Sequence, residues 1–217
     1  MARYTGPKCR YCRAEQTQLY LKGDRCSSGK CPLKSESGKR TAAPGKDPKV
    51  RGRKNTDYGL QLREKQKLKR MYGMLEKQFH ITFEKATKMS GVTGQNMINL
   101  LERRLDNVVY RLHFAKSRSQ ASQIVCHGHV MVNGRVVNIP SYQLKDGDSI
   151  SIRPQSRESK LFRENLSGLS KRENNTVSWL SLDVDAMSGK FVSNPVRSEI
   201  HDLQNVNEQL IVELYSK

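Results

Sequence analysis

Apolar side chains are scarce in this chain of 217 residues, of which 35% are hydrophobic and only 6% aromatic. The mean hydropathy is correspondingly low, at −0.73. So few apolar residues predict several small layers of structure rather than one domain with a large hydrophobic core. No run of about 18 apolar residues is present, and this absence excludes a membrane-spanning helix. The opening residues, MARYTGPKCRYC, carry no apolar stretch behind their positive charges, so we expect no secretory signal.

Acidic residues are also in short supply. The 39 Lys and Arg residues face only 21 Asp and Glu, which gives a formal net charge of +18. An excess of this size predicts a polyanionic partner, with nucleic acid as the first choice and an anionic membrane surface as the second.

The positive charge is concentrated toward the N-terminus. Residues 1–54 hold 15 basic and 4 acidic residues, a net charge of +11, and residues 55–125 hold 13 and 6, a net charge of +7. Residues 126–217 carry 11 of each sign. Solubility alone gives no reason to confine charge in this way. An unstructured basic tail would explain part of residues 34–54, but the periodic pattern of residues 58–125 favours folded surfaces that bind a polyanion.

Four of the five cysteines form the pattern C-x2-C-x13-C-x4-C, at Cys9, Cys12, Cys26 and Cys31. Two pairs of closely spaced thiolates can complete a tetrahedron around one ion, and basic neighbours favour the thiolate form. Two structural disulfides are an alternative, but they belong to oxidising compartments. The pattern therefore predicts a structural zinc site, with an iron–sulfur cluster on the same four ligands as the alternative. The fifth cysteine, Cys126, follows Ile-Val near a predicted helix end, where a small buried side chain is expected.

Residues 34–56 are rich in Lys, Arg, Gly, Ser and Pro and contain almost no large apolar side chain. Such a segment is either a plain linker or an extended basic segment that lies along the phosphate groups of a nucleic acid. The concentration of cations at Arg51, Arg53 and Lys54 favours phosphate contact.

From Asp57 to Phe79 apolar residues recur with a helical period, and a cap is available among residues 55–57. The cations of this helix fall largely away from its apolar side, and their density favours phosphate contact over a merely solvated face. They are Arg63, Lys65, Lys67, Lys69 and Arg70. A shorter helix is expected over residues 82–90.

A longer helix is predicted over residues 95–113, with Arg103, Arg104 and Arg111 on its outside. Ser117 and Gln120 fit a capping box for the next helix, over residues 118–126.

His127-Gly128 would end that helix. Asn133-Gly134 lies between two β-branched runs and predicts a hairpin, and Asp146-Gly147 predicts a turn before a third strand. Residues 104–153 thus predict a compact α-α-β-β-β unit. After a polar stretch, further β-like structure is expected from Trp179, and the apolar ending LIVELYSK is expected to dock onto the body.

The run RLDNVVYRLHFAKSRSQASQIVCHGHVMVNGRVVNIPSYQLKDGDSISIR resembles the RNA-binding domain named after ribosomal protein S4, also called the alpha-L motif. Three more segments are similar to the bacterial S4 family: GPKCRYCR with its later cysteine pair, DYGLQLREKQKLKRMYGMLEKQF, and NEQLIVELYSK. Together they cover nearly the full chain. The sequence is therefore identified as a member of the S4 family of small-subunit ribosomal proteins, of bacterial or organellar type.

The resemblance implies a function. Members bind the five-prime domain of 16S rRNA, nucleate assembly of the small subunit, lie near the messenger RNA entry path, contact ribosomal protein S5 and other small-subunit proteins, and support translational accuracy. The expected location is the cytoplasmic ribosome, or an organellar one, with neither a membrane nor a small-molecule substrate as partner.

The resemblance also implies an α+β fold. It consists of an N-terminal cysteine metal knuckle with a basic linker (1–45), a mainly helical body (46–102), an inserted RNA-binding domain (103–160) and a C-terminal segment that returns to the body (161–217). In this family the metal ligands correspond to the four N-terminal cysteines.

The predicted RNA-binding residues combine the basic segments with the positions that match the family's RNA-facing motif. They are Arg51, Arg53, Lys54, Tyr58, Arg63, Lys65, Lys69, Arg70, Arg103, Arg104, Asn107, Arg111, Lys116, Arg118, Gln120, His127, Gly128, Asn133, Gly134 and Lys145.

Two other classes of protein compete with this interpretation. An RNA-modifying enzyme that carries the same RNA-binding domain would need a catalytic domain of about 100 residues or more, and no such block remains. No phosphate-binding loop, nucleophile elbow or catalytic carboxylate pair is evident either. A zinc-ribbon DNA-binding regulator would leave the hairpin unit unexplained. An RNA-binding regulator that carries the same RNA-binding domain stays an alternative. The sequence therefore predicts a protein that is not an enzyme.

Overall fold

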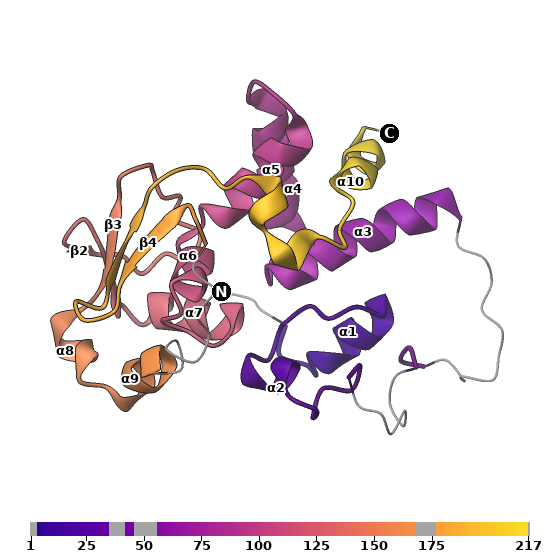
Figure 1. Cartoon of the computed structure of the whole chain (residues 1–217). Coiled ribbons are helices and arrows are strands. Elements are labelled where there is room, and N and C mark those ends of the chain that lie inside the picture. The colour runs from indigo at the N-terminus through magenta and orange to yellow at the C-terminus, as the bar shows by residue number, and fades with distance from the viewer. Residues whose placement is uncertain (1–3, 35–41, 46–55, 168–176, 217) are drawn as a thin grey trace. The chain divides into compact units, whose positions relative to one another are not determined.

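The computed structural model describes residues 4–34, 42–45, 56–167 and 177–216 (Figure 1). The chain divides into two compact units. The first contains residues 1–96 and 205–217, and the second contains residues 97–204. None of the described helices is long and apolar enough to cross a membrane.

The first unit is helical. It contains α1 (Cys9–Glu15), α2 (Asp24–Ser27), α3 (Asp57–Met71), α4 (Glu76–Lys88) and the C-terminal α10 (Glu208–Tyr215), while α5 (Thr93–Glu102) continues into the second unit. The start of α3 is capped as predicted, because the Thr56 hydroxyl accepts a hydrogen bond from the Gly59 backbone N–H at 3.2 Å.

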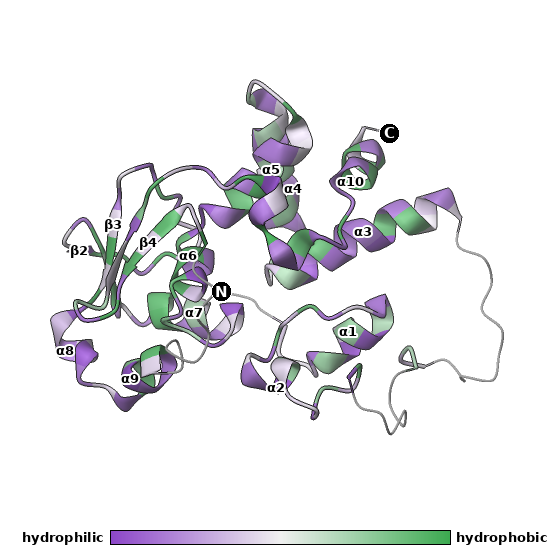
Figure 2. Cartoon of the chain, viewed as in Figure 1, coloured by the Kyte–Doolittle hydropathy of each residue, from purple (hydrophilic) through white to green (hydrophobic). Residues whose placement is uncertain are grey.

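Helix α10 packs on α3, and Gln61 donates a hydrogen bond to the Glu213 carboxylate at 3.1 Å. The predicted docking of the C-terminal segment is thereby confirmed. The core of this unit comes from apolar stripes that Figure 2 shows in green along α3 and α4. Its buried members include Leu68, Phe79 and Ile211.

Two predicted helices are interrupted. The helix predicted from Asp57 to Phe79 ends at Met71, because Gly73 turns the chain with φ +65°, a left-handed conformation that glycine adopts without strain. Helix α4 then covers both the end of that prediction and most of the shorter helix expected at 82–90.

The helix predicted over residues 95–113 is split into α5 and α6 (Leu105–Arg111). The break follows from backbone pairing with a distant loop: Leu105 donates to the Tyr142 carbonyl at 2.9 Å and Asp106 to the Pro140 carbonyl at 3.1 Å. These bonds replace intrahelical ones, which local periodicity could not reveal.

Helix α7 (Arg118–Cys126) follows the predicted boundaries. The Ser117 hydroxyl accepts from the Gln120 N–H at 3.3 Å, and the Gln120 side chain accepts from the Lys116 N–H at 2.7 Å. Gly128 takes the left-handed conformation after the helix, with φ +72°. The Ser117 cap and the helix end are both confirmed, but the Gln120 side chain reaches the N–H of Lys116 rather than that of Ser117, so the second bond of the predicted capping box is displaced by one residue.

The second unit carries an antiparallel sheet with strand order β2-β1-β3-β5-β4. The strands are β1 (Val130–Val132), β2 (Arg135–Val136), β3 (Ser149–Ile152), β4 (Leu180–Asp183) and β5 (Ser188–Phe191). The hairpin between β1 and β2 turns at Asn133 and Gly134, both with positive φ, as the sequence predicts. Strand β5 pairs with β3, so the segment after residue 161 supplies two strands to this sheet before α10 packs on α3.

Short helices complete the second unit: α8 (Pro154–Arg157), α9 (Lys160–Ser167), η1 (Arg197–Glu199) and η2 (His201–Leu203). Ile150, Ile152 and Phe191 point into the core, whereas Ser149 and Lys190 on the other side of the same strands are exposed. This alternation is the period of two expected of a sheet with one buried face. The fold is therefore α+β, with a helical body and a small antiparallel sheet.

Candidate nucleic-acid interface and cysteine cluster

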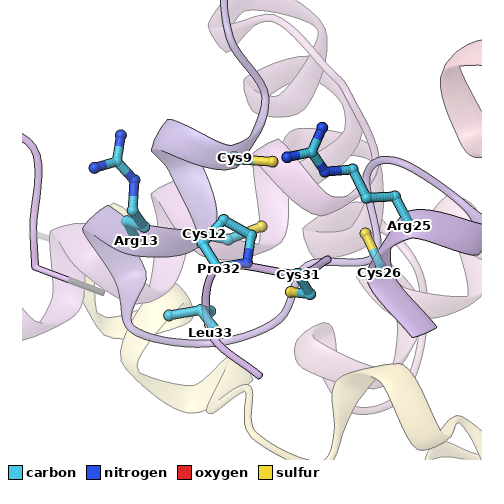
Figure 3. Close-up of a pocket in the computed structure, with 8 residues that line it drawn as sticks. All are labelled: Cys9, Cys12, Arg13, Arg25, Cys26, Cys31, Pro32 and Leu33. Carbon is cyan, nitrogen blue, oxygen red and sulfur yellow. The ribbon is translucent and has the colours of Figure 1, made fainter. Parts of the chain in front are cut away.

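The four N-terminal cysteines line one pocket (Figure 3). Cys9 and Cys12 come from α1, Cys26 from α2, and Cys31 from the turn after it. The pocket is also lined by the side chains of Arg13, Arg25, Pro32 and Leu33. All four thiols are free rather than joined in disulfides.

Polar hydrogens already point at some of the sulfurs. The Lys22 backbone N–H donates to Cys26 Sγ at 3.3 Å, and the Gln18 side chain donates to Cys31 Sγ at 3.6 Å. Burial raises the pKa of the Cys12 and Cys26 thiols, and the neighbouring cysteines act in the same direction. The thiols are thus close enough to disfavour one another's ionisation, a cost that a bound cation would reverse.

The donor set suits a structural zinc ion, which takes four thiolates in a tetrahedron. In the described part of the chain, however, no group of three or more His, Cys, Asp or Glu side chains is arranged to hold a metal ion. The predicted metal site therefore stays a prediction, and the structure shows that the four cysteines line one pocket without disulfides between them.

The predicted phosphate-binding cations of α3 are paired with carboxylates. Lys65 Nζ and Lys69 Nζ each lie 2.7 Å from a Glu76 oxygen, and Arg63 and Arg70 both bind the Glu15 carboxylate. The fifth cation of this helix, Lys67, likewise has a carboxylate partner, in Glu64. Each of these five cations consequently has a carboxylate partner, although Glu15 and Glu76 are each shared by two of them.

Glu76 holds two of those cations. Burial alone would raise its pKa, but the hydrogen bonds and charges of Lys65 and Lys69 outweigh burial and lower the pKa to about 2. Tyr215 donates its hydroxyl to the same carboxylate at 3.2 Å, and burial together with the Glu76 charge raises the tyrosine pKa. The C-terminal helix is thus tied to the paired cations of α3.

A buried ion-pair network holds the helices of the second unit together. Glu102 is fully buried and accepts hydrogen bonds from Asn107 at 2.7 Å and from Arg111 at 2.8 Å. Arg118 donates to the Asn107 side-chain oxygen at 2.8 Å and to Asp202 at 2.9 Å. Asp202 also lies 3.1 Å from Arg111, so the network, which starts at the end of α5 and runs through α6 and α7, reaches η2.

A second buried pair lies at the start of α6, where Arg104 contacts the Asp106 carboxylate at 2.7 Å. Burial raises the pKa of Asp106 although Arg104 acts against it. For Asp202, burial also acts to raise the pKa, but Arg111 and Arg118 together outweigh it and lower the pKa below its ordinary value. The ionised carboxylate of Asp202 is therefore favoured by the two arginines that share it.

Several predicted RNA-binding residues are thus buried or form hydrogen bonds and ion pairs within the protein. Arg104, Asn107 and Arg118 are buried, and Arg111 is largely covered. Arg103 donates to the Leu144 carbonyl at 2.8 Å and is ion-paired with Asp146 at 2.9 Å.

Other predicted residues lie on the surface. Those described as exposed are Tyr58, Lys116, His127, Asn133, Gly134 and Lys145, while Gln120 and Gly128 are half-buried. Arg51, Arg53 and Lys54 lie outside the described residues. Cys126, predicted to be buried, is exposed, because the end of α7 presents it to solvent.

Sequence reasoning missed Glu102 and Asp202, which neutralise the arginines of the motif. Glu102 had a local signal, since it stands in an apolar helix five residues before Asn107. Asp202 had none, because it lies 84 residues from Arg118.

Two family models match this chain. The model described as "Ribosomal protein S4/S9 N-terminal domain" matches residues 3–102, and the model described as "S4 domain" matches residues 103–150. Curated relatives named "Small ribosomal subunit protein uS4" match over all 217 residues and over their own full length. They include proteins from Thermoanaerobacter sp. (strain X514), 54% identical, Trichlorobacter lovleyi, 54% identical, and Thermus thermophilus, 50% identical.

Proposed function

The chain belongs to the S4 family of small-subunit ribosomal proteins (uS4), and from this premise we propose that it is a primary binder of the five-prime domain of 16S rRNA. It is a structural constituent of the small ribosomal subunit, an rRNA-binding protein and not an enzyme. As a ribosomal protein of bacterial type, it works in the cytoplasmic ribosome.

One observation carries the RNA-binding proposal. The matched S4 domain contains two helices and a hairpin whose exposed polar residues include Lys116, His127, Asn133 and Lys145. Lys116, His127 and Lys145 can reach an RNA surface, whereas the side chain of Asn133 is hydrogen-bonded to Asp148 and Ser149. The network arginines, Arg111 and Arg118, join the helices of the motif to one another instead. The exposed set contains no aromatic platform on the sheet, which favours recognition of folded RNA by shape and phosphate position over stacking of single bases.

The cysteine cluster is proposed to bind zinc, or alternatively an iron–sulfur cluster. Cys9, Cys12, Cys26 and Cys31 would be the four ligands, and the ion would supply only structural cross-linking because four protein ligands leave no open position. Support comes from the shared pocket and from the free state of the thiols.

The remaining partners are proposals that follow from membership in the family. They are ribosomal protein S5, other small-subunit proteins and messenger RNA near its entry path, with consequences for assembly of the subunit and for translational accuracy. The competing proposal, an RNA-modifying enzyme, has no support, because the relatives that span the whole chain are named as ribosomal proteins.

Affinity for rRNA tests the proposal directly. A transcript of the 16S five-prime domain from Thermus thermophilus should bind the full chain far more tightly than duplex DNA of equal length, over a series of salt concentrations. Equal affinity for the two nucleic acids would refute specific rRNA binding, because phosphate contacts alone do not distinguish them.

A further inference from the structure

Helix α4 separates its apolar and basic residues cleanly. Phe79, Phe83 and Ala86 are buried, one or two helical turns apart, and form its inner face. The side of the helix opposite them carries Lys77, Ile81, Lys85 and Lys88, all exposed. The lysines extend over roughly 16 Å of helix at 1.5 Å per residue.

These three lysines, called here the α4 lysine stripe, differ from the cations of α3. Every basic residue from 63 to 70 has a carboxylate partner in the first unit. Among the described residues, by contrast, Lys77, Lys85 and Lys88 have no side-chain hydrogen bond or ion pair. The one acidic residue on the same side of the helix, Glu84, lies 3.1 Å from His80 Nε2.

The difference has a physical consequence. An ammonium group that already lies beside a carboxylate gains little from a phosphate, because the attraction is offset by loss of the existing pair. An unpaired, hydrated lysine loses no internal partner on binding and releases a condensed counterion from the nucleic acid. In this unit α4, rather than α3, therefore presents cations whose charge is available.

From this contrast we infer that the α4 lysine stripe contacts phosphate groups of the bound rRNA. The inference rests on the proposed function, and it concerns residues that neither the basic pattern of α3 nor the S4 motif points to. A nucleic-acid strand fits better than a protein partner because all three unpaired charges have one sign and lie in one line, as do the phosphates of a backbone. Lysine, a flexible point charge, suits contacts that position the protein without reading bases.

The test uses the full chain and the Thermus thermophilus five-prime-domain transcript. A triple variant, Lys77→Gln, Lys85→Gln and Lys88→Gln, is compared with a matched control, Lys77→Arg, Lys85→Arg and Lys88→Arg, which keeps the charge. In the Gln variant, the slope of log affinity against log salt concentration should fall by about 2 to 3, given roughly 0.7–0.9 per lost phosphate contact. The Arg control should keep the wild-type slope, and both should unfold at the wild-type temperature because all three side chains are exposed.

Each outcome decides the matter. A Gln variant with an unchanged slope would overturn the inference while leaving the proposed function intact. The same holds if that variant binds the transcript normally but fails to enter small subunits, which would identify a protein partner instead. If the wild-type chain binds the rRNA transcript no more tightly than duplex DNA, the proposed function fails, and this inference fails with it.

Discussion

Replacement of Asp202 by Asn should destabilise the second unit through the buried network. Asp202 is the shared partner of Arg111 and Arg118, whose side chains are only 11% and 7% exposed. Asn keeps the shape of the side chain and a hydrogen-bond acceptor, but it removes the negative charge. Two largely buried guanidinium groups would then have to share the remaining carboxylate of Glu102 and the amide of Asn107.

The size of the effect follows from this geometry. Removing one partner of a buried ion pair typically costs about 3–5 kcal/mol. Because Glu102 still neutralises Arg111, we expect the lower end, about 3 kcal/mol. For a chain of this size each kcal/mol lowers the melting temperature by about 2–4 °C, so the loss should be roughly 6–12 °C. Calorimetry at pH 7 would measure it, with Asp185→Asn, an exposed residue of the same unit, as the control.

The pH dependence of the stability difference between wild type and Asp202→Asn can refute this reasoning. The folded protein lowers the pKa of Asp202, so the carboxylate contributes stability above its unfolded pKa of about 4, and this contribution is lost as the pH falls through the lower folded value. The difference between wild type and Asp202→Asn should therefore shrink in acid. A difference that stays constant down to pH 3, or a variant no less stable than the Asp185 control, would show that the charge of Asp202 does not hold the network.

Two further changes test other parts of the structure. Gly189→Ala would place a Cβ 2.6 Å from a Leu112 methyl carbon and 2.8 Å from the Ser181 carbonyl oxygen. It should lower the free energy of unfolding, measured in urea, by about 1–3 kcal/mol. Gly29→Ala is the control and should leave this free energy unchanged, because a Cβ there meets open space. If the cysteine cluster binds zinc, the purified chain should release one zinc per molecule when its thiols are modified, and chelation should expose residues 4–34 to protease. Metal-free protein in which that segment resists protease equally well would contradict a folding role for the ion.

The sequence predicts best those features whose causes are local. The Ser117 cap of α7 and the hairpin at Asn133-Gly134 need only neighbouring side chains and backbone preferences, and both are found where predicted. The interruption between α5 and α6 depends on carbonyl groups of residues 140 and 142, and the pairing of β5 with β3 joins segments nearly 40 residues apart. Nothing in a short window of sequence encodes such pairings.

The same distinction applies to the candidate site. Periodicity identifies Arg104, Arg111 and Arg118 as helical residues near the motif, but it does not reveal which carboxylates meet them in space. Asp202 reaches Arg118 only because the chain returns after the sheet. Residue type therefore indicated positive charge correctly, while long-range folding decided whether that charge faces solvent or the protein interior.

For this reason, the net charge of +18 is a poor guide to the number of phosphate contacts. In α3 the five cations share the carboxylates of Glu15, Glu64 and Glu76, and in the second unit three arginines share those of Glu102, Asp106 and Asp202. Each internal pair removes a cation from competition for phosphate, because exchanging a carboxylate for a phosphate releases little free energy. The salt dependence of rRNA binding should then follow the exposed, unpaired cations alone. If neutralising Lys65 or Lys69 instead lowers the slope of log affinity against log salt concentration, rRNA must open their ion pairs with Glu76. The internal ion pairs would then have to be treated as part of the binding equilibrium.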